Sequence, residues 1–177
     1  MSLAVTATCE IIEQTLGTSP AFEKLGDDLF IVKQGSAYVM VRVVPWDQDR
    51  AVVRCVAQMV TGIEMDGELA IKLLAMNAVM RFGTFAYEPG NRVLLFSHSI
   101  LGGPTLDPEE LVSTLTAVAI IADDWDDRII AEYGGRTMED VITDEALRRI
   151  AVSLEDEETT WDSLTPDQLP PPPEDAP

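Results

Sequence analysis

The sequence is short of positive charge. Lysine and arginine together number 12 of 177 residues, against 31 aspartate and glutamate residues, and the formal net charge at pH 7 is -19. Nucleic acids and anionic membrane surfaces are bound through basic patches, so we expect neither as a partner. A basic segment on a partner protein would be attracted to this chain, although the same charge also serves solubility.

The residue types that carry most catalytic and metal chemistry are also scarce. His98 is the one histidine, and Cys9 and Cys55 are the two cysteines, too few and too far apart for a zinc site. His98 lies in a predicted strand between Ser97 and Ser99, whose side chains point to the opposite face and cannot pair with it as nucleophiles. We therefore expect a surface or edge histidine, two buried reduced thiols, no cofactor and no enzymatic activity.

Long apolar runs are absent as well. None reaches the roughly 18 to 20 residues that a membrane-spanning helix needs, and the N-terminus lacks the basic start of a signal peptide, so we expect a cytoplasmic protein. Hydrophobic residues make up 46% of the chain, which is enough for a folded body. The predicted division is a body at 1–135, a helical extension at 136–154 and an acidic, proline-rich tail at 155–177.

Apolar residues recur at helical spacing three times in the body. The first helix is predicted at 3–16 and stops at Gly17. The third opens with Asp107 as N-cap and Pro108 at its first position, and it runs to Tyr133. The buried face predicted for this third helix comprises Leu111, Leu115, Val118, Ala122, Trp125 and Ile129. The second follows Asp66, and its buried face comprises Leu69, Leu73, Met76 and Met80, widened by Ala70, Leu74 and Ala78.

Between the helices, short segments rich in β-branched and aromatic residues predict strands. Short turns join the first three strands into an antiparallel meander, and a turn at 88–92 joins the last two into a hairpin. The order is helix, three strands, helix, two strands, helix. This order predicts an α+β fold, a five-stranded antiparallel sheet with helices packed on one side. The predicted strands are 29–33, 36–45, 51–60, 82–87 and 93–100.

Neither face of the two central strands is polar. In 36–45, for example, valines point one way while tyrosine, methionine and arginine point the other. A sheet with one face in water alternates more cleanly, so we expect the second face to be covered by a subunit, a peptide or the chain's own tail. The partner-binding residues that we predict on this face are Tyr38, Met40, Arg42, Arg54 and Val56.

An acidic cluster in the third predicted helix has the spacing of a metal-binding motif. The run Asp123-Asp-Trp-Asp-Asp127 has the Asp-Asp-x-x-Asp spacing of isoprenoid enzymes, and Asp123 and Asp127 share a helix face that could bind a hard cation. Those enzymes are large all-helical proteins with a second acidic motif, which this chain lacks. A solvated helix face is the preferred interpretation. A small metal-dependent protein that uses Asp123, Asp124 and Asp127 is the alternative.

The C-terminal part differs in composition from the body. Thr137 to Asp140 resembles a capping box, and a last short helix is predicted at 143–154. From Glu155 onward there is no basic residue, and the acids and prolines predict an extended, solvated tail. Trp161 interrupts this tail, and it either docks within the chain or serves as a recognition motif, unless the tail is simply disordered. In a further alternative, the acidic tail recruits a basic partner to a structural adaptor.

Three segments carry a family resemblance. They are Leu-Ala-Met-Asn-Ala-Val-Met at 74–80, Arg-Phe-Gly-Thr-Phe-Ala-Tyr at 81–87 and Leu-Asp-Pro-Glu-Glu-Leu at 106–111, followed by Ala-Asp at 122–123. In this order they resemble the YbjN-like family, which shares its fold with type III secretion chaperones of the CesT class. The element order matches over residues 1–133. Members are often labelled sensory transduction regulators.

The resemblance implies a homodimeric, non-enzymatic domain that binds peptides or regulates. Our first hypothesis is therefore a chaperone-like protein that dimerises and holds an extended or partly folded protein segment. Affinity would come from main-chain pairing at an edge strand or from apolar pockets on the sheet.

Overall fold

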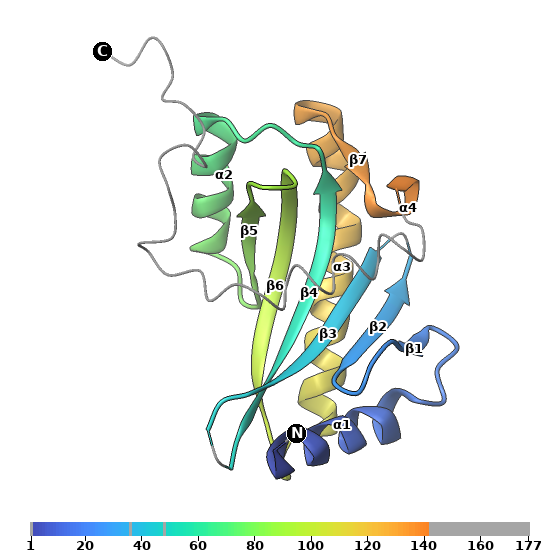
Figure 1. Cartoon of the computed structure of the whole chain (residues 1–177). Coiled ribbons are helices and arrows are strands. Elements are labelled where there is room, and N and C mark those ends of the chain that lie inside the picture. The colour runs from blue at the N-terminus through green and yellow to red at the C-terminus, as the bar shows by residue number, and fades with distance from the viewer. Residues whose placement is uncertain (1, 36, 48, 142–177) are drawn as a thin grey trace.

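The computed structural model describes residues 2–35, 37–47 and 49–141 (Figure 1). The helices are α1 (Leu3–Leu16), α2 (Gly67–Asn77), α3 (Pro108–Tyr133) and α4 (Met138–Val141). The strands are β1 (Phe22–Lys24), β2 (Leu29–Gln34), β3 (Ala37–Pro45), β4 (Ala51–Thr61), β5 (Thr84–Glu88), β6 (Val93–Gly102) and β7 (Arg136–Thr137).

Aspartate caps fix the starts of α2 and α3. The Asp66 side chain accepts a hydrogen bond from the backbone N–H of Leu69 at 2.7 Å. The predicted N-cap of α3 is confirmed, since Asp107 accepts from the N–H of Glu109 at 2.8 Å and Pro108 follows it. Each cap satisfies a donor that the helix itself cannot pair, so both helices begin where the sequence predicts.

The strands form one antiparallel sheet in the order β1-β2-β3-β4-β6-β5, and β7 pairs with β4. The predicted class is confirmed, but the predicted count of five strands is wrong because β1 and β7 add two. These strands have three and two residues, too short to show an alternating pattern. β4 and β6 are neighbours although α2 and β5 lie between them in the sequence.

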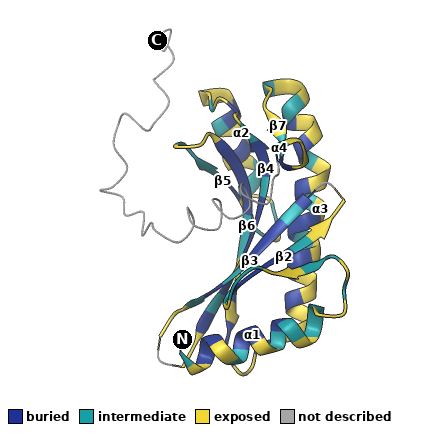
Figure 2. Ribbon diagram, turned by 45° about the vertical axis from the view of Figure 1, so that its right-hand side comes forward, coloured by how far each residue is buried: buried dark blue, intermediate teal, exposed yellow. Residues whose placement is uncertain are grey.

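The core lies between the sheet and the helices α1 and α3. Both helices contact β3, β4 and β6; in Figure 1 α3 runs behind the sheet, and Figure 2 shows their buried sides turned towards it. The predicted face of α3 is confirmed, with Trp125 only half-buried and packed at the margin. Its fully packed members are Leu111, Leu115, Val118, Ala122 and Ile129. Burial of each large aliphatic side chain stabilises the fold by about 1.5–3 kcal/mol.

α2 packs against β5 at the edge of the sheet. Leu69 and Leu73 are buried as predicted, whereas Leu74 is 67% exposed, so its expected place on the buried face is wrong. The side chain of Asn77 fixes the helix to the strand, because it accepts from the N–H of Phe85 at 2.7 Å and donates to the C=O of Phe85 at 3.2 Å.

The last described segment confirms a local prediction. Thr137 and Asp140 form a reciprocal capping box, in which the Asp140 N–H donates to Thr137 Oγ1 and the Thr137 N–H donates to Asp140 Oδ2, both at 3.3 Å. The helix predicted at 143–154, the tail and Trp161 lie outside the described residues. Of the helices described, none is long and apolar enough to cross a membrane.

Candidate binding surface

The face of the sheet turned away from α1 and α3, here called the distal face, is built by β2, β3, β4 and β6. Its residues share one side because directly paired residues of neighbouring strands do so. Leu29 pairs with Arg42, and Arg42 with Arg54. Ile31 pairs with Met40, and Met40 with Val56. The distal-face residues used below are Leu29, Ile31, Tyr38, Met40, Arg42, Arg54, Val56, Val93 and Leu95.

Two apolar clusters on the distal face stand apart from the main core. One consists of Leu29, Ile31 and Met40, with Tyr38 packed against them. The other consists of Val56, Val93 and Leu95. The sheet therefore has apolar side chains on both faces, which agrees with the lack of a polar face in the sequence of its central strands.

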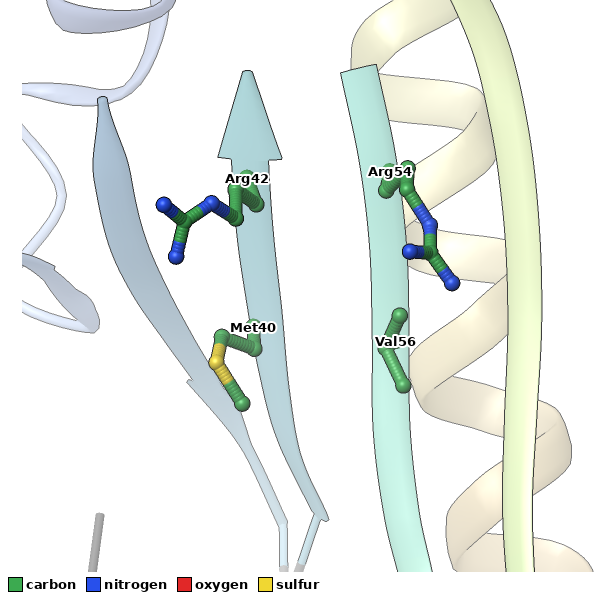
Figure 3. Close-up of a pocket in the computed structure, with 4 residues that line it drawn as sticks. All are labelled: Met40, Arg42, Arg54 and Val56. Carbon is green, nitrogen blue, oxygen red and sulfur yellow. The ribbon is translucent and has the colours of Figure 1, made fainter. Parts of the chain in front are cut away.

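A small hollow lies between β3 and β4 at the centre of this face (Figure 3). Met40 and Arg42 of β3 and Arg54 and Val56 of β4 line it, and its volume is about 10 Å³. That is room for about one water molecule, whereas small-molecule sites occupy roughly 300–1,000 Å³. The hollow therefore suits contact with side chains of a polypeptide better than a cofactor.

Two of the four residues that line the hollow are arginines. They face each other directly across β3 and β4, an arrangement in which like charges repel. Figure 3 shows the Arg42 guanidinium turned towards β2 and that of Arg54 towards β6, with Met40 next to Arg42 along β3 and Val56 next to Arg54 along β4. Arg42 is also 3.9 Å from the carboxylate of Asp28. Arg54 is exposed, and among the described residues it forms no ion pair.

The structure brings together four of the six predicted binding residues, Met40, Arg42, Arg54 and Val56. Tyr38 lies on the same face, nearer the start of β3, with the ammonium of Lys33 5.0 Å from the centre of its ring. Trp161 lies outside the described residues. Binding by these side chains remains a prediction.

Sequence reasoning missed the distal-face residues of β2 and β6. Leu29 and Ile31 belong to the run Leu-Phe-Ile-Val, and Val93 and Leu95 to the run Val-Leu-Leu-Phe. Such runs show no alternation, so the two sides of the strand cannot be told apart from sequence. The available signal was the run itself, since a strand that is apolar throughout is buried on both faces.

The acidic cluster of α3 does not assemble into a metal site. Asp126 is buried, and its neighbours Asp123, Asp124 and Asp127 are exposed. In the part of the chain that the structure describes, no group of three or more histidine, cysteine, aspartate or glutamate side chains is placed to hold a metal ion. The metal-dependent alternative thus gains no support.

The histidine and the cysteines have structural surroundings. His98 lies at an edge of the sheet, as predicted, because β5 pairs with β6 only as far as Ser97. Its half-buried Nδ1 accepts from the N–H of Gly83 at 3.1 Å. Both thiols are free and buried, as predicted. Burial raises the pKa of Cys9 to about 11 and that of Cys55 to about 12, so little reactive thiolate forms at neutral pH.

A second, wider depression lies between α1 and α3. Its lining consists of Thr15, Pro108, Glu109, Val112 and Ser113, and its volume is about 410 Å³. The one charged side chain in this lining is an acid, and no histidine or thiol accompanies it. The depression therefore offers neither a catalytic pair nor a counter-charge for this acidic chain, and the distal face remains the stronger candidate.

The protein is an α+β domain with helices on one face of its sheet and an apolar, arginine-flanked hollow on the other. The family model described as T3SS (YopN, CesT) and YbjN peptide-binding chaperone 1 (TY-Chap1) matches residues 4–141. The chain belongs to this family, which confirms the resemblance seen in the sequence. A search among curated proteins finds no match.

Proposed function

We propose that this protein is a non-enzymatic, cytoplasmic, homodimeric chaperone that holds an extended or partly folded segment of another protein on its distal face. The observation that carries the proposal is the apolar hollow between Arg42 and Arg54, on a member of a family of peptide-binding chaperones. An extended segment presents alternate side chains to a surface. Apolar side chains would pack into the hollow against the small exposed parts of Met40 (5%) and Val56 (3%), while carboxylates or carbonyls would accept from the guanidinium groups.

The edges of the sheet are less suited to bind such a segment. Edge pairing needs a free row of N–H and C=O groups. β1 offers three residues, with Glu23 and Lys24 exposed. At the other edge, Asn77 occupies the N–H and C=O of Phe85 in the middle of β5. These features favour the face over the edge as the binding surface.

The test is a charge reversal of Arg54. An array of 15-residue peptides supplies the strongest binder, and fluorescence anisotropy gives its Kd. Because Arg54 is exposed, Arg54→Glu leaves the fold intact and is expected to weaken binding at least tenfold, as loss of a charge-assisted hydrogen bond of about 1.5–3 kcal/mol would. Arg128→Glu, the same charge change on the exposed side of α3, is the control. Equal losses in both variants, or no binder in the array, would contradict the proposal.

The dimer contact that we propose lies on the outer side of α2 and the turn after it. Ile71 is 71%, Leu74 67%, Val79 81% and Phe82 46% exposed. The segment 69–82 contains two basic residues and no acid. Two copies with a charge of -19 each repel one another. The electrostatic repulsion is smallest where acids are absent, and exposed apolar side chains there favour association.

Leu74→Glu is expected to raise the dimer dissociation constant at least tenfold, because it places an acid at the centre of this contact. Glutamate is a good helix former, so α2 keeps its structure. Sedimentation equilibrium measures the change, and Ile120→Glu, at a residue 46% exposed on α3, is the matched control. A wild-type protein that stays monomeric at every concentration, or a Leu74→Glu protein that dimerises unchanged, would contradict this assignment.

A further inference from the structure

We infer that residues 155–177 of this chain are the resting occupant of its own distal face, with Trp161 over the hollow and the flanking acids beside Arg42 and Arg54. The tail closes the surface until a partner segment displaces it. The inference rests on the proposed function, because it concerns regulation of the same face.

Charge complementarity favours this occupant over a second copy of the body. Residues 155–177 contain eight of the 31 acids and no lysine or arginine. The distal face carries Arg42 and the exposed Arg54 within an otherwise acidic protein. Attraction between exposed charges fades beyond about 8–10 Å at physiological salt, so the tail is drawn to these arginines only where it lies directly on the face.

The apolar residues of the tail suit the shape of the hollow. Trp161, Leu164 and Leu169 are its large apolar side chains, and Pro166 and Pro170 flank Leu169, a composition that favours an extended chain. A flat indole ring can cover Met40 and Val56 while a guanidinium stacks on its face. This kind of pairing already occurs in α3, where the guanidinium carbon of Arg128 lies 5.1 Å from the ring centre of Trp125.

The distal face is within reach of the tail. The described chain leaves the body at α4, which contacts β3 and β4, and Glu139 of α4 lies 3.5 Å from the ammonium of Lys33 at the Tyr38 end of the face. From Tyr38, Arg42 is four residues and roughly 13 Å farther along β3, at about 3.3 Å per residue. The helix predicted at 143–154 would span about 18 Å at 1.5 Å per residue, and residues 155–161 add up to about 23 Å when extended. No unfolding of the body is needed.

Tethering makes even weak binding effective. A flexible linker of this length gives an effective concentration on the order of 1 mM. If the separate tail peptide binds with a Kd of about 100 µM, the tethered tail occupies the face in about nine of ten molecules and weakens any competing segment about tenfold.

The test uses the full chain and a fluorescein-labelled synthetic peptide of residues 155–177. Trp161→Ala vacates the face, so the labelled peptide is expected to bind this variant about tenfold more tightly than wild type. Trp46→Ala, at a tryptophan 64% exposed in the β3–β4 turn, is the matched control and leaves the affinity unchanged. Adding Arg54→Glu to Trp161→Ala removes the gain.

Equal binding of the peptide to wild type and Trp161→Ala, or binding to neither, would overturn the inference. So would conversion of a dimer into a monomer by Trp161→Ala, since the face would then belong to a second copy. The array peptide that tests the proposed function separates the two ideas. If Trp161→Ala binds the array peptide in an Arg54-dependent way but ignores the tail peptide, only the inference fails. If it binds neither, both fail.

Discussion

Gly83→Ala is expected to destabilise the fold by about 2–5 kcal/mol, a large part of the roughly 5–15 kcal/mol that holds a typical domain together. Gly83 has a φ of +69°, and an added Cβ would lie 2.5 Å from Cε1 of Phe96 and 2.8 Å from the carbonyl oxygen of Ser97. The left-handed backbone costs an L-residue about 1–2 kcal/mol. Overpacking adds about 1–3 kcal/mol, because Phe96 is fully buried and has no room to move.

Two other glycines separate these contributions in urea unfolding. Gly62 has a φ of +74° with nothing within 4 Å of an added Cβ, so Gly62→Ala shows the backbone cost alone. Gly67 opens α2 with ordinary backbone angles and open space, so Gly67→Ala is expected to change stability by about 0.5 kcal/mol at most. If Gly83→Ala proved no less stable than Gly62→Ala, the Phe96 ring would have moved to make room for the added Cβ, and the expected overpacking would be wrong.

Asn77→Ala is expected to cost about 2–3 kcal/mol and to promote self-association. The side chain satisfies both main-chain groups of Phe85 on the outer edge of β5. Its removal forfeits two hydrogen bonds of about 1 kcal/mol each and leaves half-buried polar groups unpaired. The same groups then offer an edge for pairing with other chains.

Urea unfolding, light scattering and exchange of the Phe85 amide hydrogen measure these effects. Asn91→Ala is the matched control, because Asn91 is exposed in the β5–β6 turn, and its stability is expected to change by about 0.5 kcal/mol at most. If the exchange rate of the Phe85 amide hydrogen stayed unchanged in Asn77→Ala, water would have replaced the Asn77 side chain without loss of stability, and the prediction would be wrong.

The elements that the sequence predicts are those whose burial repeats with the backbone period. α1 spans 3–16 as predicted, and α3 runs from Pro108 to Tyr133, because caps and apolar spacing act within one segment. β1 and β7 were not predicted, because segments of three and two residues are too short to show a periodic pattern. The placement of β6 beside β4 depends on contacts between distant segments, to which local patterns are blind.

The same distinction holds for the distal face. Met40 and Arg42 alternate with valines in β3, and Arg54 and Val56 alternate with buried residues in β4. Since side chains two residues apart on a strand point to the same face, this alternation alone predicts that all four face away from the core. Their meeting in one hollow needed the register of the two strands, which the sequence does not display. The prediction that Leu74 belongs to the buried face of α2 is wrong for a related reason. Apolar residues occur on several sides of this helix, and only one side can pack against β5.

The separation of β4 from β6 along the chain also sets an interval during synthesis. β4 is complete at Thr61, whereas its neighbour β6 ends at Gly102. At about 5–20 residues per second, the ribosome takes roughly 2–8 seconds to supply the intervening chain. Until then the meander of β2, β3 and β4 has an unpaired edge and apolar side chains on both faces. During those seconds the nascent chain is partly folded and exposes apolar side chains. It then resembles the protein segments that we propose the finished protein binds.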